Sequence, residues 1–143
     1  MISRCSSRAA VGVAAALLMT LNACHPARDS NDADQAVALF HQRLTSGLDE
    51  IIYDESAPEF QRSVDRETVH KWFARIRRKM GAPGVSRRIV YRVTYSSDGI
   101  HANASYVTKY SNGEAHETFT WGITGGKALL VGFLLQSNAM LTD

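Results

Sequence analysis

The chain has 143 residues, a formal net charge of +2 and 45% apolar residues, which is enough for one domain and a short leader but not for two full domains. Charged residues make up 21% of the sequence, and it holds ten glycines and three prolines. This ordinary globular composition excludes a wholly disordered, collagen-like or low-complexity protein.

The first 23 residues have the pattern of a secretory signal peptide. Arg4 and Arg8 precede an apolar stretch, residues 9–20, that is too short to span a membrane, because a spanning helix needs about 20 apolar residues. The next four residues, Leu21-Asn22-Ala23-Cys24, resemble the lipobox of bacterial lipoproteins. The resemblance implies cleavage before Cys24, diacylation of its thiol and acylation of the new amino terminus.

The cysteine content favours this lipid anchor. The sequence has two cysteines, Cys5 and Cys24, and the first lies in the predicted leader, so the mature chain has no pair of thiols for a disulfide. The alternative is an ordinary cleaved signal with a stray cysteine. His25 follows the cysteine instead of an aspartate, which by resemblance to enterobacterial sorting signals implies delivery to the outer membrane, facing the periplasm. We assign residues 24–32 to a lipidated tether and 33–143 to one folded domain.

Charge is unevenly distributed within the predicted domain. Residues 28–67 hold 4 basic and 10 acidic side chains, whereas residues 68–109 hold 9 basic and 1 acidic. We expect the two segments to attract each other in the folded state. The basic cluster is either a solvated face partly neutralised by the acidic segment, which we favour, or a site for lipid headgroup or lipopolysaccharide phosphates. No nucleic acid is expected as a partner in the envelope. The cluster comprises Arg75, Arg77, Arg78, Lys79, Arg87 and Arg88.

Two helices are predicted in the first half of the domain. Asp32 and Gly47 are plausible start and stop signals for the first, and Asp65 and Gly81 for the second. The connection over residues 48–61 is apolar enough to be packed down, with room for a short third helix. Apolar residues recur at helical spacing in both helices. They are Ala33, Val37, Phe40 and Leu44 in the first, and Val69, Trp72, Phe73, Ile76 and Met80 in the second.

After Pro83 the apolar period changes to two, which is typical of strands. Three glycine-bearing turn signals follow at regular spacing: Asp98-Gly99, Asn112-Gly113 and Gly125-Gly126. Each has the form of a two-residue hairpin loop between alternating strands. The sequence therefore predicts a four-stranded antiparallel meander.

The three turns also predict which residues pair across the sheet. They place Tyr91 opposite Tyr106, Tyr106 opposite Phe119, and Trp121 opposite Leu130, so the aromatic side chains share one face. The two helices are expected to cover that face. The predicted fold class is α+β, with two N-terminal helices packed on one face of the four-stranded sheet.

This order of elements resembles the cystatin-like and NTF2-like α+β domains and, more closely, small uncharacterised bacterial lipoproteins of that shape. The resemblance covers nearly all of residues 34–137 and rests on structural motifs. It brings no established activity and no catalytic residues. The matching stretches are Phe40-His41-Gln42, Ser56-Ala57-Pro58-Glu59-Phe60, Arg77-Arg78-Lys79-Met80-Gly81, Glu117-Thr118-Phe119 and Leu130-Val131-Gly132-Phe133.

The sequence lacks the usual catalytic motifs, including Gly-x-Ser-x-Gly, the Walker loop and His-Glu-x-x-His. Its five histidines have no metal-ligand spacing, so no metal or cofactor is expected. The polar residue of most interest is Glu117, which the predicted register places on the helix-covered face. There it either forms a structural ion pair with an arginine, the interpretation we favour, or lines a pocket with Tyr106 and Tyr91 that binds a small ligand or supports an enzymatic reaction.

The last predicted strand carries apolar residues on both faces. Leu129, Val131, Phe133 and Leu135 are expected on the outer face of an edge strand, where an apolar row requires cover. The cover is either the chain's own ends or a partner, which would make this row a homodimer or envelope-protein interface. We interpret the protein as a membrane-anchored envelope lipoprotein with a non-enzymatic, protein-binding or structural domain. The alternative is the pocket centred on Glu117 and Tyr106.

Overall fold

Helices fill the first half of the computed structural model, which describes residues 30–141. Two of the helices are long, α1 (Ser30–Thr45) and α4 (Arg66–Met80), and they correspond to the two predicted helices. Two short ones, α2 (Asp49–Asp54) and α3 (Pro58–Ser63), occupy the connection, where the sequence left room for one. The described part of the chain contains no helix long and apolar enough to cross a membrane.

Helix α4 begins and ends at the residues that the sequence indicated. The side chain of Asp65 accepts a hydrogen bond of 2.9 Å from the backbone N–H of Thr68, which satisfies one of the free donors of the first turn. Gly81 ends the helix with φ +74°, a conformation that favours glycine. A Cβ at Gly81 would also lie 2.9 Å from the Cβ of Ser111, so the close approach of the turn that follows Tyr110 leaves no room for a side chain.

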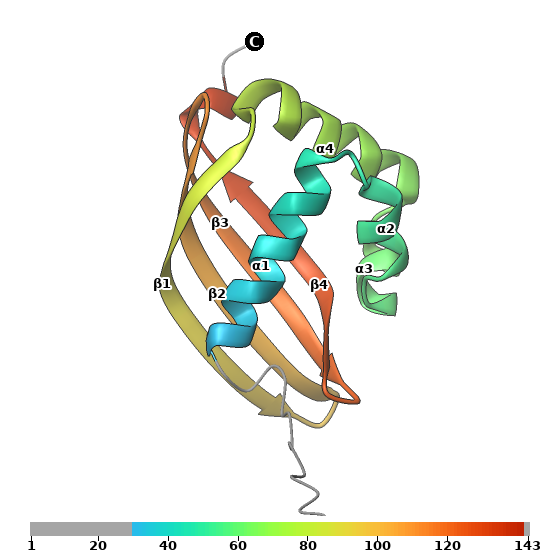
Figure 1. Cartoon of the computed structure of the whole chain (residues 1–143). Helices are drawn as coiled ribbons and strands as arrows, with labels where there is room; N and C mark the ends of the chain where they lie inside the picture. Colours follow the sequence, from blue (N-terminus) through green and yellow to red (C-terminus); the bar gives the residue numbers. More distant parts are fainter. Residues whose placement is uncertain (1–29, 142–143) are drawn as a thin grey trace, which may run out of the picture.

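The second half forms one open antiparallel sheet of order β1-β2-β3-β4, which confirms the predicted meander. Its strands are β1 (Pro83–Ser96), β2 (Gly99–Tyr110), β3 (Gly113–Thr124) and β4 (Lys127–Gln136), and a 3-10 turn (Asn138–Met140) follows. Figure 1 shows the sheet curving around α1, with all four helices on the same side. Strands β1 and β4 are therefore the two edges.

The first two hairpins turn one residue earlier than predicted, so the predicted cross-strand pairs are wrong by two residues. Tyr91 lies opposite Ala104, and Tyr106 lies opposite Glu117. The reason is that Gly99 does not sit inside the loop but begins the next strand, paired with Ser96. Because the error is an even number of residues, inward-facing side chains remain inward-facing.

The third hairpin turns at Gly125-Gly126 as predicted, and Trp121 lies opposite Leu130. One step further the register shifts between Thr120 and Trp121, because β4 contains one extra residue, Val131. This is a β-bulge, in which two residues of one strand face one residue of its neighbour. All pairs beyond the bulge differ from the predicted ones.

The bulge overturns the prediction that Leu129, Val131, Phe133 and Leu135 form one outer row. Phe133 packs against the core, and Leu135 is only 8% exposed within it. Leu134, which alternation with that outer row would have placed on the inner face, is 52% exposed. A slip of one residue exchanges the two faces of a strand, so the apolar residues beyond Val131 turn inward and the outer row does not exist.

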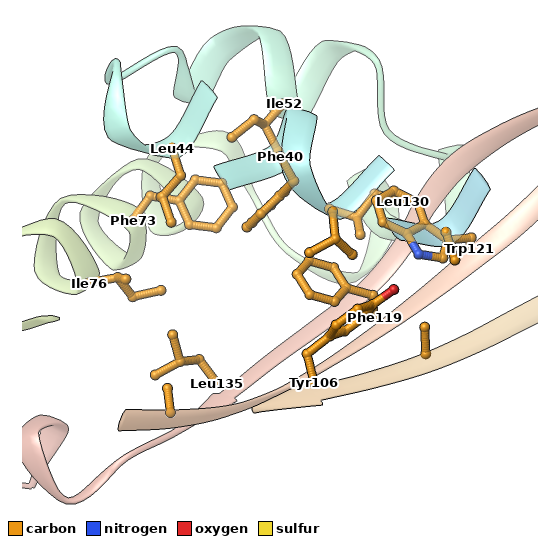
Figure 2. Close-up of a cluster of buried hydrophobic side chains, with 14 of the residues drawn as sticks. Phe40, Leu44, Ile52, Phe73, Ile76, Tyr106, Phe119, Trp121, Leu130 and Leu135 are labelled. Atoms are coloured by element: carbon orange, nitrogen blue, oxygen red, sulfur yellow. The ribbon is translucent and has the colours of Figure 1, made fainter. Parts of the chain in front are cut away.

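Aromatic rings fill the space between the helices and the sheet. The ring of Phe40 lies 5.6, 5.1 and 4.7 Å from the rings of Phe73, Phe119 and Phe133 respectively. Trp121 stacks on Phe119 with ring centroids 5.6 Å apart. Figure 2 shows Phe40 and Phe73 approaching from the helices toward Phe119 on the sheet. Offset and edge-on ring pairs of this kind add stability beyond the apolar area they bury.

Ion pairs join the acidic and basic segments, as their charges predicted. Arg77 donates to both carboxylate oxygens of Asp49, at 2.5 and 2.8 Å, and Arg88 lies 2.6 Å from Asp34. Asp49 is 2% exposed, so this two-point pairing satisfies a buried carboxylate. Part of the basic cluster is thereby neutralised by the chain itself.

Candidate functional site

Glu117 lies at the centre of a buried polar cluster, and its side chain is fully buried. Its carboxylate accepts hydrogen bonds from the hydroxyls of Tyr110 and Thr108, both at 2.5 Å. The ring Nε2 of His41 lies 3.1 and 3.0 Å from the two carboxylate oxygens. We call these four residues the Glu117 cluster. The partner of Glu117 is thus a histidine, and the expectation of an arginine partner was wrong.

Three elements position this cluster. Thr108 and Tyr110 stand two residues apart on β2 and therefore share its inner face, next to Glu117 on β3. His41 belongs to α1 and is buried against the sheet. Burial, and then the charge of Glu117, raise the pKa of Tyr110 well above its usual value, so its hydroxyl stays protonated and continues to donate. Three donors therefore meet one carboxylate, and both of its oxygens are hydrogen-bonded.

His41 and Ser86 connect the cluster to the surface. The Ser86 hydroxyl lies 2.9 Å from that of Thr108, which in turn donates to Glu117. Ser86 and His41 both line a groove of about 560 Å³ between α1 and β1, which we call the α1–β1 groove. The hydrogen-bonded chain Ser86–Thr108–Glu117–His41 therefore starts on one wall of this groove and ends on the other.

The three residues of the predicted pocket do not line one cavity. Glu117 is sealed, whereas Tyr106 lines the α1–β1 groove and Tyr91 lines a separate void of about 10 Å³. The Tyr106 hydroxyl donates to Asp34 at 2.8 Å. Burial, with the Asp34 carboxylate as the second cause, raises the pKa of Tyr106 above its usual value. The guanidinium carbon of Arg88 lies over the ring of Tyr91, 5.7 Å from the centroid of that ring.

A larger groove lies on the other side of α1. It has a volume of about 940 Å³ and is bounded by α1, the α2–α3 region and the β3–β4 hairpin; we call it the α1–β4 groove. Buried Phe40, Ile52, Trp121 and Leu130 contribute to its lining, and Leu39 does so while 45% exposed. The lining is thus largely apolar and open to a partner.

Trp121 has an unusual place in this groove. Among residues 30–141, its indole Nε1 is the single buried side-chain nitrogen or oxygen without a hydrogen-bond partner. A buried N–H without an acceptor costs about 1–3 kcal/mol.

The outer edge of β4 is covered beside this groove. The backbone N–H of Ala57, which precedes α3, donates to the carbonyl of Leu130 at 2.9 Å. This bond occupies an acceptor that an edge strand otherwise presents to another chain. The groove is therefore shaped for side chains rather than for an added strand at this point.

The sequence analysis missed His41 as a site residue. His41 follows Val37 by four residues and precedes Leu44 by three, within the buried stripe of α1. A titratable residue inside an apolar stripe was the available signal, because a buried polar group requires a partner. Its partner, Glu117, is 76 residues away in the chain, and no local pattern links the two.

No group of three or more histidine, cysteine, aspartate or glutamate side chains is placed to hold a metal ion in the described part of the chain. The predicted lipid attachment at Cys24 lies outside the described residues. No protein-family model and no curated protein matches this sequence.

Proposed function

We propose that the protein is a membrane-anchored envelope lipoprotein, held through Cys24 at the outer membrane and facing the periplasm. Its cystatin- or NTF2-like domain works by binding another protein and carries out no chemistry of its own. The observation that supports this proposal is the α1–β4 groove, with its largely apolar lining. Binding sites typically combine an apolar surface with a few polar groups that fix orientation.

A protein suits the α1–β4 groove better than a small, enclosed ligand does. The groove is open, and Leu39 presents an apolar side chain at its rim. Arg43 pairs with Glu55 at 2.7 Å within its lining, so the rim is polar around an apolar centre. Protein interfaces have this arrangement. A second copy of the chain is one such partner.

The alternative, a pocket centred on Glu117 and Tyr106, has less support. The Glu117 carboxylate already accepts from three donors, and the Tyr106 hydroxyl already donates to Asp34. The Glu117 carboxylate is sealed and the Tyr106 proton is engaged within the protein, so neither group is directed at a substrate.

The anchor is tested by metabolic labelling with palmitate. We expect label in the wild-type chain and none in Cys24→Ala, because the thiol is the proposed attachment point. Equal labelling of both chains would contradict the anchor.

The binding surface is tested by photocrosslinking of the membrane-bound protein. A photoreactive amino acid at Leu39 should give a defined crosslinked species, and the same group at Leu134 should not. The two positions are matched, since they are 45% and 52% exposed, but only Leu39 lies in the groove. The same products from both sites, or none from Leu39, would refute the groove as the binding surface.

A further inference from the structure

His41 has one ring nitrogen left for a ligand. A carboxylate is an acceptor only, so the Nε2 of His41 carries the hydrogen that it shares with Glu117. In the neutral ring Nδ1 is then an acceptor. No hydrogen bond within residues 30–141 engages Nδ1, and it is not among the buried atoms that lack a partner. His41 is 7% exposed and lines the α1–β1 groove, so this nitrogen has access to the groove.

The orientation of the His41 ring is fixed by groups on the side away from the groove. Glu117 is held by the two hydroxyls of Thr108 and Tyr110, and it holds Nε2 in turn. Carboxylate–histidine pairs of this kind fix both the tautomer and the direction of the outer nitrogen. A site whose polar groups are already oriented loses less entropy when it binds a ligand.

The remaining polar groups of the groove are hydroxyls and an amide. Gln42 and Ser46 are exposed and stand one turn apart on α1, and Ser86 faces them from β1. The one acidic side chain in the lining, Asp34, is paired with Arg88 and accepts from Tyr106. The groove therefore offers many hydrogen-bonding groups, and its one acidic side chain is already paired. This favours a neutral ligand over an ion.

We propose that the α1–β1 groove is a second binding site, independent of the α1–β4 groove, for a neutral, hydroxyl-rich ligand of the saccharide class. One ligand hydroxyl donates to Nδ1 of His41. Others bond to the Gln42 amide and to the hydroxyls of Ser46 and Ser86. The volume of about 560 Å³ lies within the range of sites for small organic ligands.

The test is NMR of the ¹⁵N-labelled full chain, with the neutral disaccharide N,N′-diacetylchitobiose as the probe and inorganic phosphate and spermidine as charged comparisons. We expect His41 to show one protonated nitrogen, Nε2. Its Nδ1 resonance should shift saturably with the disaccharide and not with either ion. His101 and His116, which lie outside the groove, serve as internal controls. Two protonated nitrogens on His41, no shift with the disaccharide, or tighter binding of an ion would each overturn the proposal.

A matched pair of variants distinguishes binding from a change in fold. Gln42→Ala removes an exposed amide of the groove and should weaken disaccharide binding about fivefold, the value of one hydrogen bond of about 1 kcal/mol. Thr118→Ala, on the opposite face of the sheet, should leave the affinity unchanged. Both positions lie outside the buried core, so both variants are expected to fold. Equal affinity of Gln42→Ala and wild type would count against the site.

Discussion

Phe40 and His41 are neighbours on α1, yet their side chains enter two different environments. Phe40 joins a cluster of rings from α4, β3 and β4, whereas His41 joins the Glu117 cluster. The first environment is stabilised by buried apolar area, which is non-directional. The second depends on hydrogen bonds with defined donors and acceptors.

The two environments should therefore respond differently to substitution. Removing one ring leaves a cavity whose cost depends on its volume. Removing a member of the polar cluster costs more than the lost bond itself when it leaves a partner buried and unsatisfied. We therefore expect the polar side to fix how α1 is placed on the sheet and the aromatic side to contribute more of the stability.

The largest effect is expected on the aromatic side. Phe119→Ala should lower the free energy of unfolding by about 4 kcal/mol, because the ring is fully buried and contacts Phe40, Trp121 and Phe133. Leu134→Ala, at a 52% exposed position on β4, should change it by no more than about 0.5 kcal/mol. Urea denaturation of both variants measures the difference, and similar values would place Phe119 outside the core.

On the polar side, His41→Ala should lower the free energy of unfolding by about 3 kcal/mol, since it leaves a buried carboxylate without one of its three hydrogen-bond donors. Glu117→Gln should have a cost of the same order. In a double-mutant cycle the losses of unfolding free energy in the two single variants should sum to more than the loss in the double variant. The reason is that each single change leaves the other residue without its partner. Simple additivity would show that the two side chains do not interact.

Tyr110 should make stability fall at alkaline pH. Its pKa is raised in the folded state, so above the unfolded value of about 10 the unfolded chain has released a proton that the folded chain retains. The free energy of unfolding is then complete below pH 10 and decreases as the pH rises. Tyr110→Phe should cost about 2 kcal/mol at neutral pH and show a shallower decrease between pH 10 and 11. Parallel profiles in denaturant titrations would contradict this.

The smallest effect is expected from Thr108→Val, which keeps the shape but removes one donor to Glu117. We expect a loss of about 1 kcal/mol, because His41 and Tyr110 still satisfy the carboxylate. Thr118→Val removes a hydroxyl contact to Ser105 on the outer face and is the matched control. An equal loss in the two variants would mean that burial adds nothing to the Thr108 bond.

Local patterns predicted the elements of this fold well. The apolar stripe of α4, its Asp65 cap and its Gly81 stop are properties of neighbouring residues, and the structure contains all three. The four strands followed from alternation and turn residues. Pairing was predicted less well, because a glycine near a turn can lie inside the loop or just after it, as Gly99 does.

The bulge and the polar cluster required information that distant residues supply. A signal for the bulge existed in Gly122 and Gly132, two glycines within strands, since such positions often mark bulges. A Cβ at Gly122 would lie 3.0 Å from the Cγ2 of Val131. The pairing of His41 with Glu117 had no comparable signal, because it depends on how α1 is placed on the sheet.

The bulge at Val131 keeps the inner and outer faces of β4 in agreement with the chemistry of its residues. Deleting Val131 would make the pairs Leu130–Trp121 and Gly132–Thr120 consecutive, and Phe133 and Leu135 would still point inward, opposite Phe119 and Glu117. If the strand instead paired through Val131 without a bulge, parity would turn Phe133 and Leu135 toward solvent and Leu134 toward the rings. Every side chain would be retained, yet the second half of the strand would be inside out. The bulge is therefore as much a part of the folding instructions as the chemistry of the residues that follow it.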